Sequence, residues 1–176
     1  MRSHRARIAL VAALAASAVP LVAQERPPLS PPAQATATIA GQTITIDYSS
    51  PRMRTRKIYG ALVPFDKVWR TGANAATTLT TSGALMIGDL QVPAGKYTLF
   101  TLPGEKEWQL IVNQQTGQWG TNYDATQDLG RVPMKVSALE SPREEMTIAI
   151  RPGEGNQATL AIEWESTAAT VAIVVH

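Results

Sequence analysis

The chain has 176 residues, no cysteine, two histidines and a formal net charge of +2. The missing cysteine excludes disulfides, thiol nucleophiles and thiolate metal sites, and the histidines, His4 and His176, are too few and too close to the termini for a Ser-His-Asp triad or an imidazole metal site. No glycine-rich phosphate cradle stands between a predicted strand and a helix, so we expect no metal and no cofactor.

The first 23 residues are typical of a secretory signal peptide. Arg2, Arg5 and Arg7 precede an uncharged run over residues 8–19, and Ala23 offers the small residue of a cleavage site. The run is about a dozen residues long, whereas a membrane-spanning helix needs roughly 20. We therefore expect export to the periplasm or beyond, with no membrane span after cleavage; a buried N-terminal helix is the alternative.

Cleavage of this leader also changes the charge of the chain. Three of the 16 basic residues lie in the leader, so the rest of the chain holds fewer basic residues than its 14 acidic ones. An electrostatic field that attracts nucleic acid is therefore not expected. Residues 24–34 contain four prolines and indicate an extended spacer, and residues 35–176 are expected to form a single domain.

From residue 35 onward, hydrophobic and polar residues alternate with a period of two, which indicates short strands. Residues 36–39 and 42–48 flank Ala40-Gly41, a two-residue hairpin signal. Pro64 limits a helical turn within residues 58–70, the one segment compatible with it. Further strands are predicted over residues 77–81, 84–87, 90–92, 96–102, 107–113, 146–150, 160–164 and 170–175.

About nine or ten short strands without a long helical period predict an all-β fold. We expect an antiparallel two-sheet β-sandwich of the jelly-roll type with at most one short helical turn, and a closed β-barrel is the main alternative. Trp108 and Trp164 alternate with polar neighbours on their strands, so both are assigned to the core.

Residues 48–78 are the least strand-like part of the domain and carry a local excess of positive charge. Guanidinium groups bind carboxylates, phosphates and sulfates and stack on aromatic rings, which favours an anionic or polyhydroxylated (sugar-like) ligand. The alternative is a solvated loop whose arginines pair with glutamates of the C-terminal half. Against the single acid Asp66, the basic residues are Arg52, Arg54, Arg56, Lys57, Lys67 and Arg70.

Within this stretch, the segment WRTGAN, residues 69–74, places Trp69, Arg70, Thr71 and Asn74 around a glycine. Such a set can form the wall of a polar pocket. It can equally be a structural knot in which Arg70 and Asn74 bind loop carbonyls and Trp69 fills the core. Both interpretations stay open at this point.

The sequence resembles the bacterial domain of unknown function 2911 family. The resemblance is carried by residues 48–78, by VPAGKYTLFTLPGEKEWQLIVN at residues 92–113, and by QWG at 118–120 with Asp128 and Arg131 downstream. It covers nearly all of the chain after the leader and is most specific at WRTGAN. The resemblance implies an exported, β-rich domain and no reaction, so it assigns no catalytic residue.

The polar loop after residue 113 contains further candidates. Trp119 is a platform for a sugar or a partner, or a cap on the end of the sandwich. Asn122, Asp124 and Asp128 could bind Ca²⁺ through oxygens, but their spacing does not match an EF-hand loop and a plain turn explains them as well. Asp128 and Arg131 are close enough in sequence to pair with each other.

Three functions are compatible with these features. A hydrolase or lyase acting on a glycan or another envelope component would need two of Asp47, Asp66, Asp124 and Asp128 roughly 5–9.5 Å apart. A structural or assembly protein is also possible. We favour a non-catalytic envelope ligand-binding module, because loops on a rigid β scaffold often form such sites. Its predicted ligand-binding residues are Arg56, Trp69, Arg70, Asn74, Asn113, Trp119 and Arg131.

Overall fold

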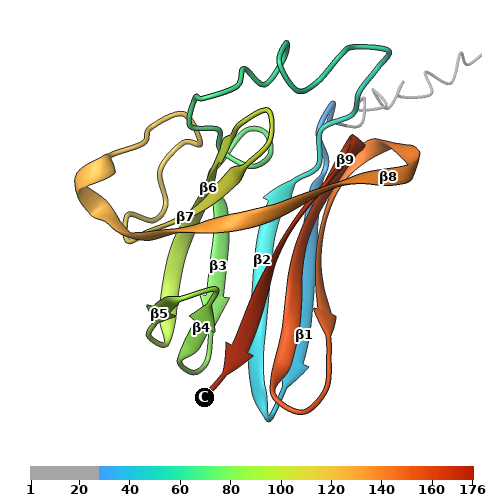
Figure 1. The fold of residues 1–176 in the computed structure, drawn as a ribbon. Coiled ribbons are helices and arrows are strands. Elements are labelled where there is room, and N and C mark those ends of the chain that lie inside the picture. The colour runs from blue at the N-terminus through green and yellow to red at the C-terminus, as the bar shows by residue number, and fades with distance from the viewer. Residues whose placement is uncertain (1–27) are drawn as a thin grey trace, which may run out of the picture.

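A computed structural model describes residues 28–176 (Figure 1). The expected signal peptide and the first part of the spacer lie outside the described residues. The described chain forms nine strands and one 3₁₀ turn: β1 (Pro32–Ile39), β2 (Gln42–Ser49), β3 (Thr77–Thr81), β4 (Leu85–Ile87), β5 (Leu90–Val92), β6 (Gly95–Pro103), β7 (Trp108–Asn113), η1 (Ala125–Gln127), β8 (Asp128–Pro152) and β9 (Gln157–Val175).

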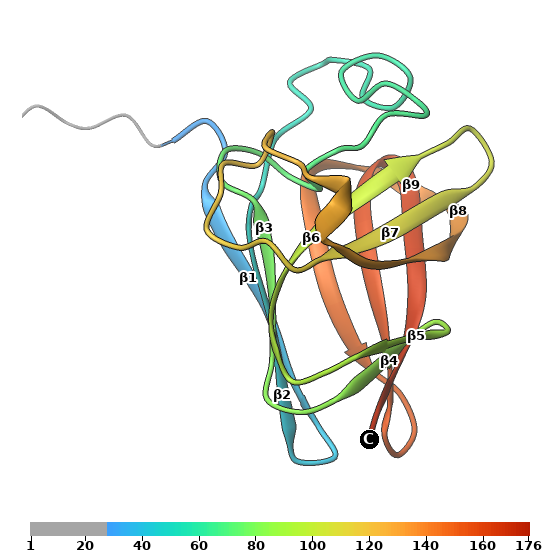
Figure 2. The ribbon, with the colours of Figure 1, turned by 90° about the vertical axis from the view of Figure 1, so that its left-hand side faces the viewer.

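All nine strands belong to one antiparallel sheet in the order β1-β2-β3-β6-β7-β8-β9-β4-β5. Strand β8 joins the two halves of this sheet, because residues 128–134 pair with β7 and residues 135–152 pair with β9. Figure 2 shows β1 and β2 on one side of the molecule and the long strand β9 on the other. The sheet thus folds over on itself and encloses the core.

The prediction of an all-β chain is confirmed, and so is the number of strands. A division into two sheets is not confirmed, because hydrogen bonds link all nine strands in one order. The sheet is not closed into a barrel either. Within the described residues, its edge strands β1 and β5 do not pair with each other. The strands form one sheet and not two because β8 and β9 are long, with 25 and 19 residues. β8 pairs with β7 at one end and with β9 at the other, and its register shifts between Ala138 and Thr147.

The one helical turn of the described residues is η1, not the predicted segment 58–70. Asp124 caps η1, because its carboxylate accepts the backbone N–H of Thr126 at 2.9 Å. Residues 58–70 follow an irregular path that buries Ile58, Tyr59 and Val63. No helix of residues 28–176 is long and apolar enough to cross a membrane.

The core lies between the two halves of the sheet. Trp108 and Trp164 are 2% and 1% exposed, so their predicted place in the core is confirmed. The ring of Tyr59 meets both indoles edge-on, with centroids 4.8 Å from Trp108 and 6.3 Å from Trp164. The irregular segment that carries WRTGAN packs on this aromatic cluster through Trp69.

The outer face of β6 is covered as well. Side chains alternate between the two faces of a strand, so Phe100 points away from the core-facing Leu99. Phe100 is nevertheless only 1% exposed, because Tyr123 from the loop over residues 114–127 packs on it with ring centroids 4.9 Å apart. This second, smaller packing layer positions the polar residues described next.

Candidate functional site

The WRTGAN segment is fixed against β6. Trp69 and Thr101 exchange two backbone hydrogen bonds of 2.8 and 2.9 Å, and the hydroxyl of Thr71 donates to Thr101 Oγ1 at 3.1 Å. Gly72 has a φ of +153°, and a Cβ there would lie 3.0 Å from the carbonyl oxygen of Ser49. Glycine is therefore required at this position, and the side chains on either side of it are held by a rigid backbone.

Trp69 joins this segment to the core. Its indole stacks on that of Trp164, with centroids 6.0 Å apart and an interplanar angle of 17°, and it meets Tyr59 edge-on at 6.2 Å. Trp69 is nevertheless only partly buried. The ring thus has both a structural role and a surface left over for a ligand.

Arg70 is a partly buried cation without a protein partner. Its Nε is buried and makes no hydrogen bond, and none of the four ion pairs among residues 28–176 involves it. Its aliphatic stem packs under Gly120, where a Cβ would lie 2.6 Å from Arg70 Cδ. The guanidinium is therefore held in place with donors that no described residue uses.

Two cavities flank Arg70, which lines both of them. The larger cavity has a volume of 250 Å³ and the smaller cavity 160 Å³. No acidic residue lines either one, so no carboxylate competes for the positive charge. The larger cavity is lined by Ser30, Pro51, Arg56, Leu62, Val63, Trp69, Arg70, Gly72, Ala73 and Trp164. The smaller cavity is lined by Val68, Trp69, Arg70, Phe100, Gly120, Thr121 and Tyr123.

Arg56 contributes the second positive charge of the larger cavity. Its Nε donates to the Met53 carbonyl at 2.9 Å and its Nη2 donates to the Arg52 carbonyl at 2.7 Å. These two bonds fix the guanidinium to the backbone of its own loop. Arg56 therefore adds charge to the cavity but has fewer donors free for a ligand than Arg70.

A short N-terminal strap, Pro28–Pro31, lies beside the larger cavity, and its Ser30 is part of the lining. The Leu29 carbonyl accepts Arg54 Nη2 at 3.1 Å, the Ser30 carbonyl accepts Asn74 Nδ2 at 3.4 Å, and the Pro31 carbonyl accepts the Ser50 N–H at 2.8 Å. Asn74, a predicted ligand-binding residue, is thus engaged in holding the strap.

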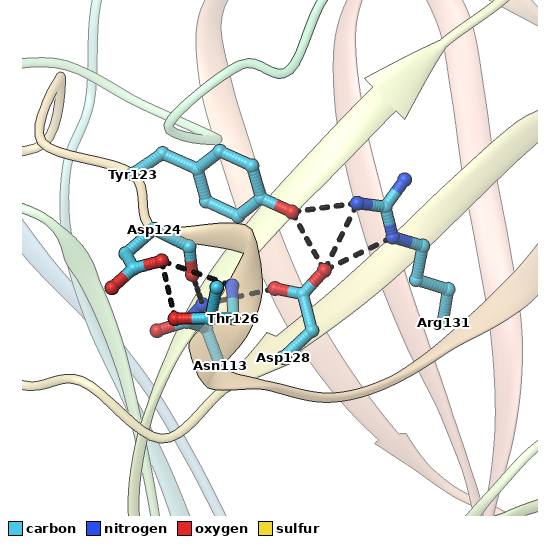
Figure 3. Close-up of polar contacts among 6 residues, drawn as sticks. All are labelled: Asn113, Tyr123, Asp124, Thr126, Asp128 and Arg131. Carbon is cyan, nitrogen blue, oxygen red and sulfur yellow. Dashed lines mark hydrogen bonds and ion pairs between the residues drawn. The ribbon is translucent and has the colours of Figure 1, made fainter.

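Asn113 and Arg131, two further predicted ligand-binding residues, lie in a separate polar cluster (Figure 3). Asn113 Nδ2 donates to Asp128 Oδ1 at 2.9 Å. Arg131 forms an ion pair with Asp128 Oδ2 at 2.9 Å and donates to Tyr123 Oη at 2.6 Å, while the Tyr123 hydroxyl donates to Asp128 Oδ2 at 2.6 Å. These side chains satisfy one another and tie the 114–127 loop to β7 and β8.

The environment of this cluster changes the ionisation of Tyr123. Desolvation and the neighbouring Asp128 carboxylate raise the pKa of Tyr123 to about 12. The phenol therefore stays protonated at neutral pH and donates to Asp128. Tyr123 also lines the smaller cavity, and its hydroxyl is already paired with Asp128 and Arg131.

The remaining candidates lie apart from both cavities. Trp119 is 54% exposed and pairs with Ala75 through a backbone bridge. Asp47 accepts Gln34 Nε2 at 2.7 Å, and Asp66 lies in an exposed turn with a φ of +57°. Asp124 caps η1, and the hydrogen bonds from Thr126 lower the pKa of its carboxyl group.

Larger hollows exist elsewhere on the surface but contain none of the predicted ligand-binding residues. One of 620 Å³ lies along residues 139–147, and one of 500 Å³ lies beside Asp66 and residues 102–109. Acidic side chains line both. Within the described residues, no group of three or more His, Cys, Asp or Glu side chains could hold a metal ion.

The larger cavity therefore brings together Arg56, Trp69 and Arg70 of the predicted set. Sequence reasoning missed Leu62 and Trp164 as lining residues. Trp164 was assigned to the core, which is correct, but its strand gives no signal that its ring borders a cavity. Leu62 is 46% exposed, and an isolated leucine in a loop carries no functional signal in the sequence.

A comparison with models of protein families matches residues 30–173 to "Protein of unknown function (DUF2911)". This match covers most of the chain. The chain belongs to this family. The resemblance found in the sequence is thereby confirmed, and the family description assigns no activity. Comparisons with curated proteins and with solved structures find no match.

Proposed function

We propose that this protein is an exported, non-catalytic module that binds a small anionic or polyhydroxylated ligand in the larger cavity beside Arg70. The observation that carries the proposal is the unpartnered guanidinium of Arg70. A buried donor left without an acceptor costs roughly 1–3 kcal/mol, and more when the group is charged. An oxyanion in the cavity would supply that acceptor with a charge-assisted hydrogen bond.

The charge distribution around the cavity supports the same proposal. Arg56 and Arg70 both line it, and no acidic side chain does. In contrast, Arg52, Arg131, Arg143 and Arg151 pair with carboxylates, and Arg54 donates to the Leu29 carbonyl outside the lining. The cavity is thus a site where positive charge is retained without compensation.

Export to the cell envelope is part of the proposal and rests on the sequence of the leader. The basic start, the short apolar run and the small residue at position 23 support it. A ligand in that compartment would meet the protein outside the cytoplasm. Detection of a chain that begins at Gln24 in the periplasmic fraction tests this part by itself.

The hydrolase alternative has less support, because the four carboxylates proposed for it have other partners or lie apart. Asp47 accepts a bond from Gln34, and Asp124 caps η1. Asp128 is shared by Tyr123, Arg131 and Asn113. The structural alternative has the exposed Trp119 in its favour.

The proposal is tested by a thermal-shift screen of the purified chain against carboxylates, inorganic phosphate, sulfate, uronic acids and neutral sugars. A ligand that binds only the folded state raises the midpoint of unfolding. We expect at least one compound to raise the midpoint of the wild type and not that of Arg70→Met, which keeps the stem that packs on Gly120.

Lys67→Met is the matched control, because Lys67 is an exposed cation of the same loop that lines neither cavity. It should respond to the ligand like the wild type. The proposal is wrong if no compound shifts the midpoint, or if Arg70→Met and the wild type shift equally.

A further inference from the structure

We infer that the ligand of the larger cavity is a single-ring aromatic carboxylate, with its anionic group on Arg70 and its ring against Trp69 and Leu62. This inference rests on the proposed function and narrows it to one chemical class. Three properties of the cavity carry it: the balance of donors and acceptors, the apolar wall and the volume.

The polar side chains of the lining are almost all hydrogen-bond donors. Arginine and tryptophan side chains donate and do not accept. Arg56, Arg70 and Trp69 are of this kind, and the indole N–H of Trp164 already donates to the Glu144 carbonyl at 3.2 Å. Ser30 alone among the lining side chains has a hydroxyl that can accept. A sugar must both donate and accept at each hydroxyl, so most of its donors would stay unpaired here, whereas a carboxylate only accepts.

The rest of the lining is apolar. Leu62, Val63, Trp69 and Trp164 contribute apolar side chains to the lining, and of these Leu62 and Trp69 keep part of their surface exposed. Leu62 is 46% exposed although it lines a cavity, so a ligand ring would remove its side chain from water. Burial of apolar surface on both partners favours a ring over a second polar group.

The volume limits the ligand to one ring. Pockets for drug-sized ligands measure about 300–1,000 Å³, and the larger cavity measures 250 Å³. A ring with a short carboxylate arm fits this scale. The smaller cavity of 160 Å³ is the competing location, but the hydroxyl of Tyr123 there already bonds Asp128 and Arg131.

The test is calorimetric titration of the purified chain with phenylacetate, acetate and glucuronate. These three share a carboxylate and differ in the rest of the molecule. We expect phenylacetate to bind about tenfold or more tightly than either of the others, in line with burial of one apolar ring. Arg70→Met should abolish binding of all three while keeping the wild-type near-ultraviolet circular dichroism.

Two further variants locate the ring. Leu62→Ala, at an exposed position, should weaken phenylacetate several-fold and leave acetate unchanged. Tyr123→Phe removes the hydroxyl bonded to Asp128 and Arg131 but alters no residue that lines the larger cavity, so it should leave phenylacetate binding as in the wild type. Loss of binding in Tyr123→Phe with retention in Leu62→Ala would place the ligand in the smaller cavity and overturn the inference.

The outcomes also separate the inference from the proposed function. Arg70-dependent binding with equal or tighter affinity for acetate or glucuronate would overturn the aromatic class and leave the proposed function standing. Binding of phenylacetate that survives in Arg70→Met would overturn both. Absence of any binding, together with no response in the wider thermal-shift screen, would also overturn both.

Discussion

Arg70 and Gly120 are in such close contact that the glycine has no room for a side chain. A Cβ on Gly120 would lie 2.6 Å from Arg70 Cδ and 2.7 Å from the backbone oxygen of Asn74. The backbone oxygen cannot rotate away, so a side chain at position 120 would push against the Asn74 backbone as well as against the Arg70 stem.

We therefore expect Gly120→Ala to disrupt the packing of the 114–127 loop against the WRTGAN segment and to destabilise the folded state. Overpacking of this kind costs about 1–3 kcal/mol, and it should reduce ligand affinity together with stability. Urea unfolding measures the loss. Gly153→Ala is the control, because its Cβ would lie 3.4 Å from its nearest neighbour, and a loss of equal size there would contradict the account.

Glu163 of β9 offers a prediction about stability, because its buried carboxylate has two arginine partners. Arg143 Nε lies 2.7 Å from Glu163 Oε2, an ion pair without hydrogen-bond geometry, and Arg151 Nη2 lies 2.5 Å from Oε1. The glutamate side chain is 6% exposed and the arginines are about half exposed.

Either Arg143→Ala or Arg151→Ala alone should cost about 1 kcal/mol or less, because the other cation remains. The double variant leaves a buried carboxylate unpaired and should cost about 3–5 kcal/mol. The excess over the sum of the single variants is the quantity to measure by urea unfolding. Simple additivity would show that the two arginines act independently and do not substitute for each other at Glu163.

Tyr123 predicts a pH dependence at the alkaline end. Its pKa is about 12 in the folded chain against 10.0 for a free phenol, so the folded state holds this proton more tightly than the unfolded state. The corresponding stability is complete below pH 10 and is lost as the pH rises through about 12. Asp128→Asn removes a neighbouring negative charge and should lower the pKa of Tyr123, as NMR titration of the ring would show.

Tyr123→Phe identifies the signal in that titration, because the resonance that disappears belongs to Tyr123. An unchanged pKa in Asp128→Asn would mean that desolvation alone produces the shift.

The strap gives a prediction about motion. Asn74 has a φ of +58°, so Asn74→Gly keeps the backbone conformation and removes only the bond to the Ser30 carbonyl. We expect faster hydrogen exchange at the Ser50 amide, which bonds the Pro31 carbonyl, with a change of about 0.5–1 kcal/mol in global stability. Exchange as slow as in the wild type would show that Asn74 does not hold the strap.

Much of the fold was predictable from the sequence because the local signals agree with it. Ala40 and Gly41 have φ values of 49° and 80°, which is the primed turn that a two-residue hairpin needs, and β1 and β2 pair around it as predicted. The places of Trp108 and Trp164 followed from alternation. Strand β1 begins at Pro32, inside the expected spacer, because proline is tolerated at the first residue of an edge strand.

Strand β8 was not predicted over most of its length. It contains Pro133 and Pro142 and many exposed charges, so the alternation that identifies a strand is missing between its two ends. Likewise the sequence predicts two strands within β9, because the alternation stops between Trp164 and Thr170; in the structure Glu165 has a φ of +54° at this point. Pairing along the whole sheet, and not the local residues, makes these segments strands.

The candidate site was predictable in part. WRTGAN stood out because it combines an aromatic ring, a cation and a carboxamide around a glycine. The separation of Arg70 from Asn113 and Arg131 could not be predicted, because the partners that engage these two side chains come from Tyr123 and Asp128. The contact between Trp69 and Trp164 joins residues far apart in sequence, which no local pattern indicates.

The most direct test of the central claim is to follow the Arg70 Nε–H by NMR during titration with phenylacetate. A charge-assisted hydrogen bond to the ligand should move this resonance downfield and slow its exchange with water, with saturation that matches the calorimetric affinity. A resonance that stays in place at saturating ligand would show that Arg70 does not bind the anion, and the proposed site would be wrong.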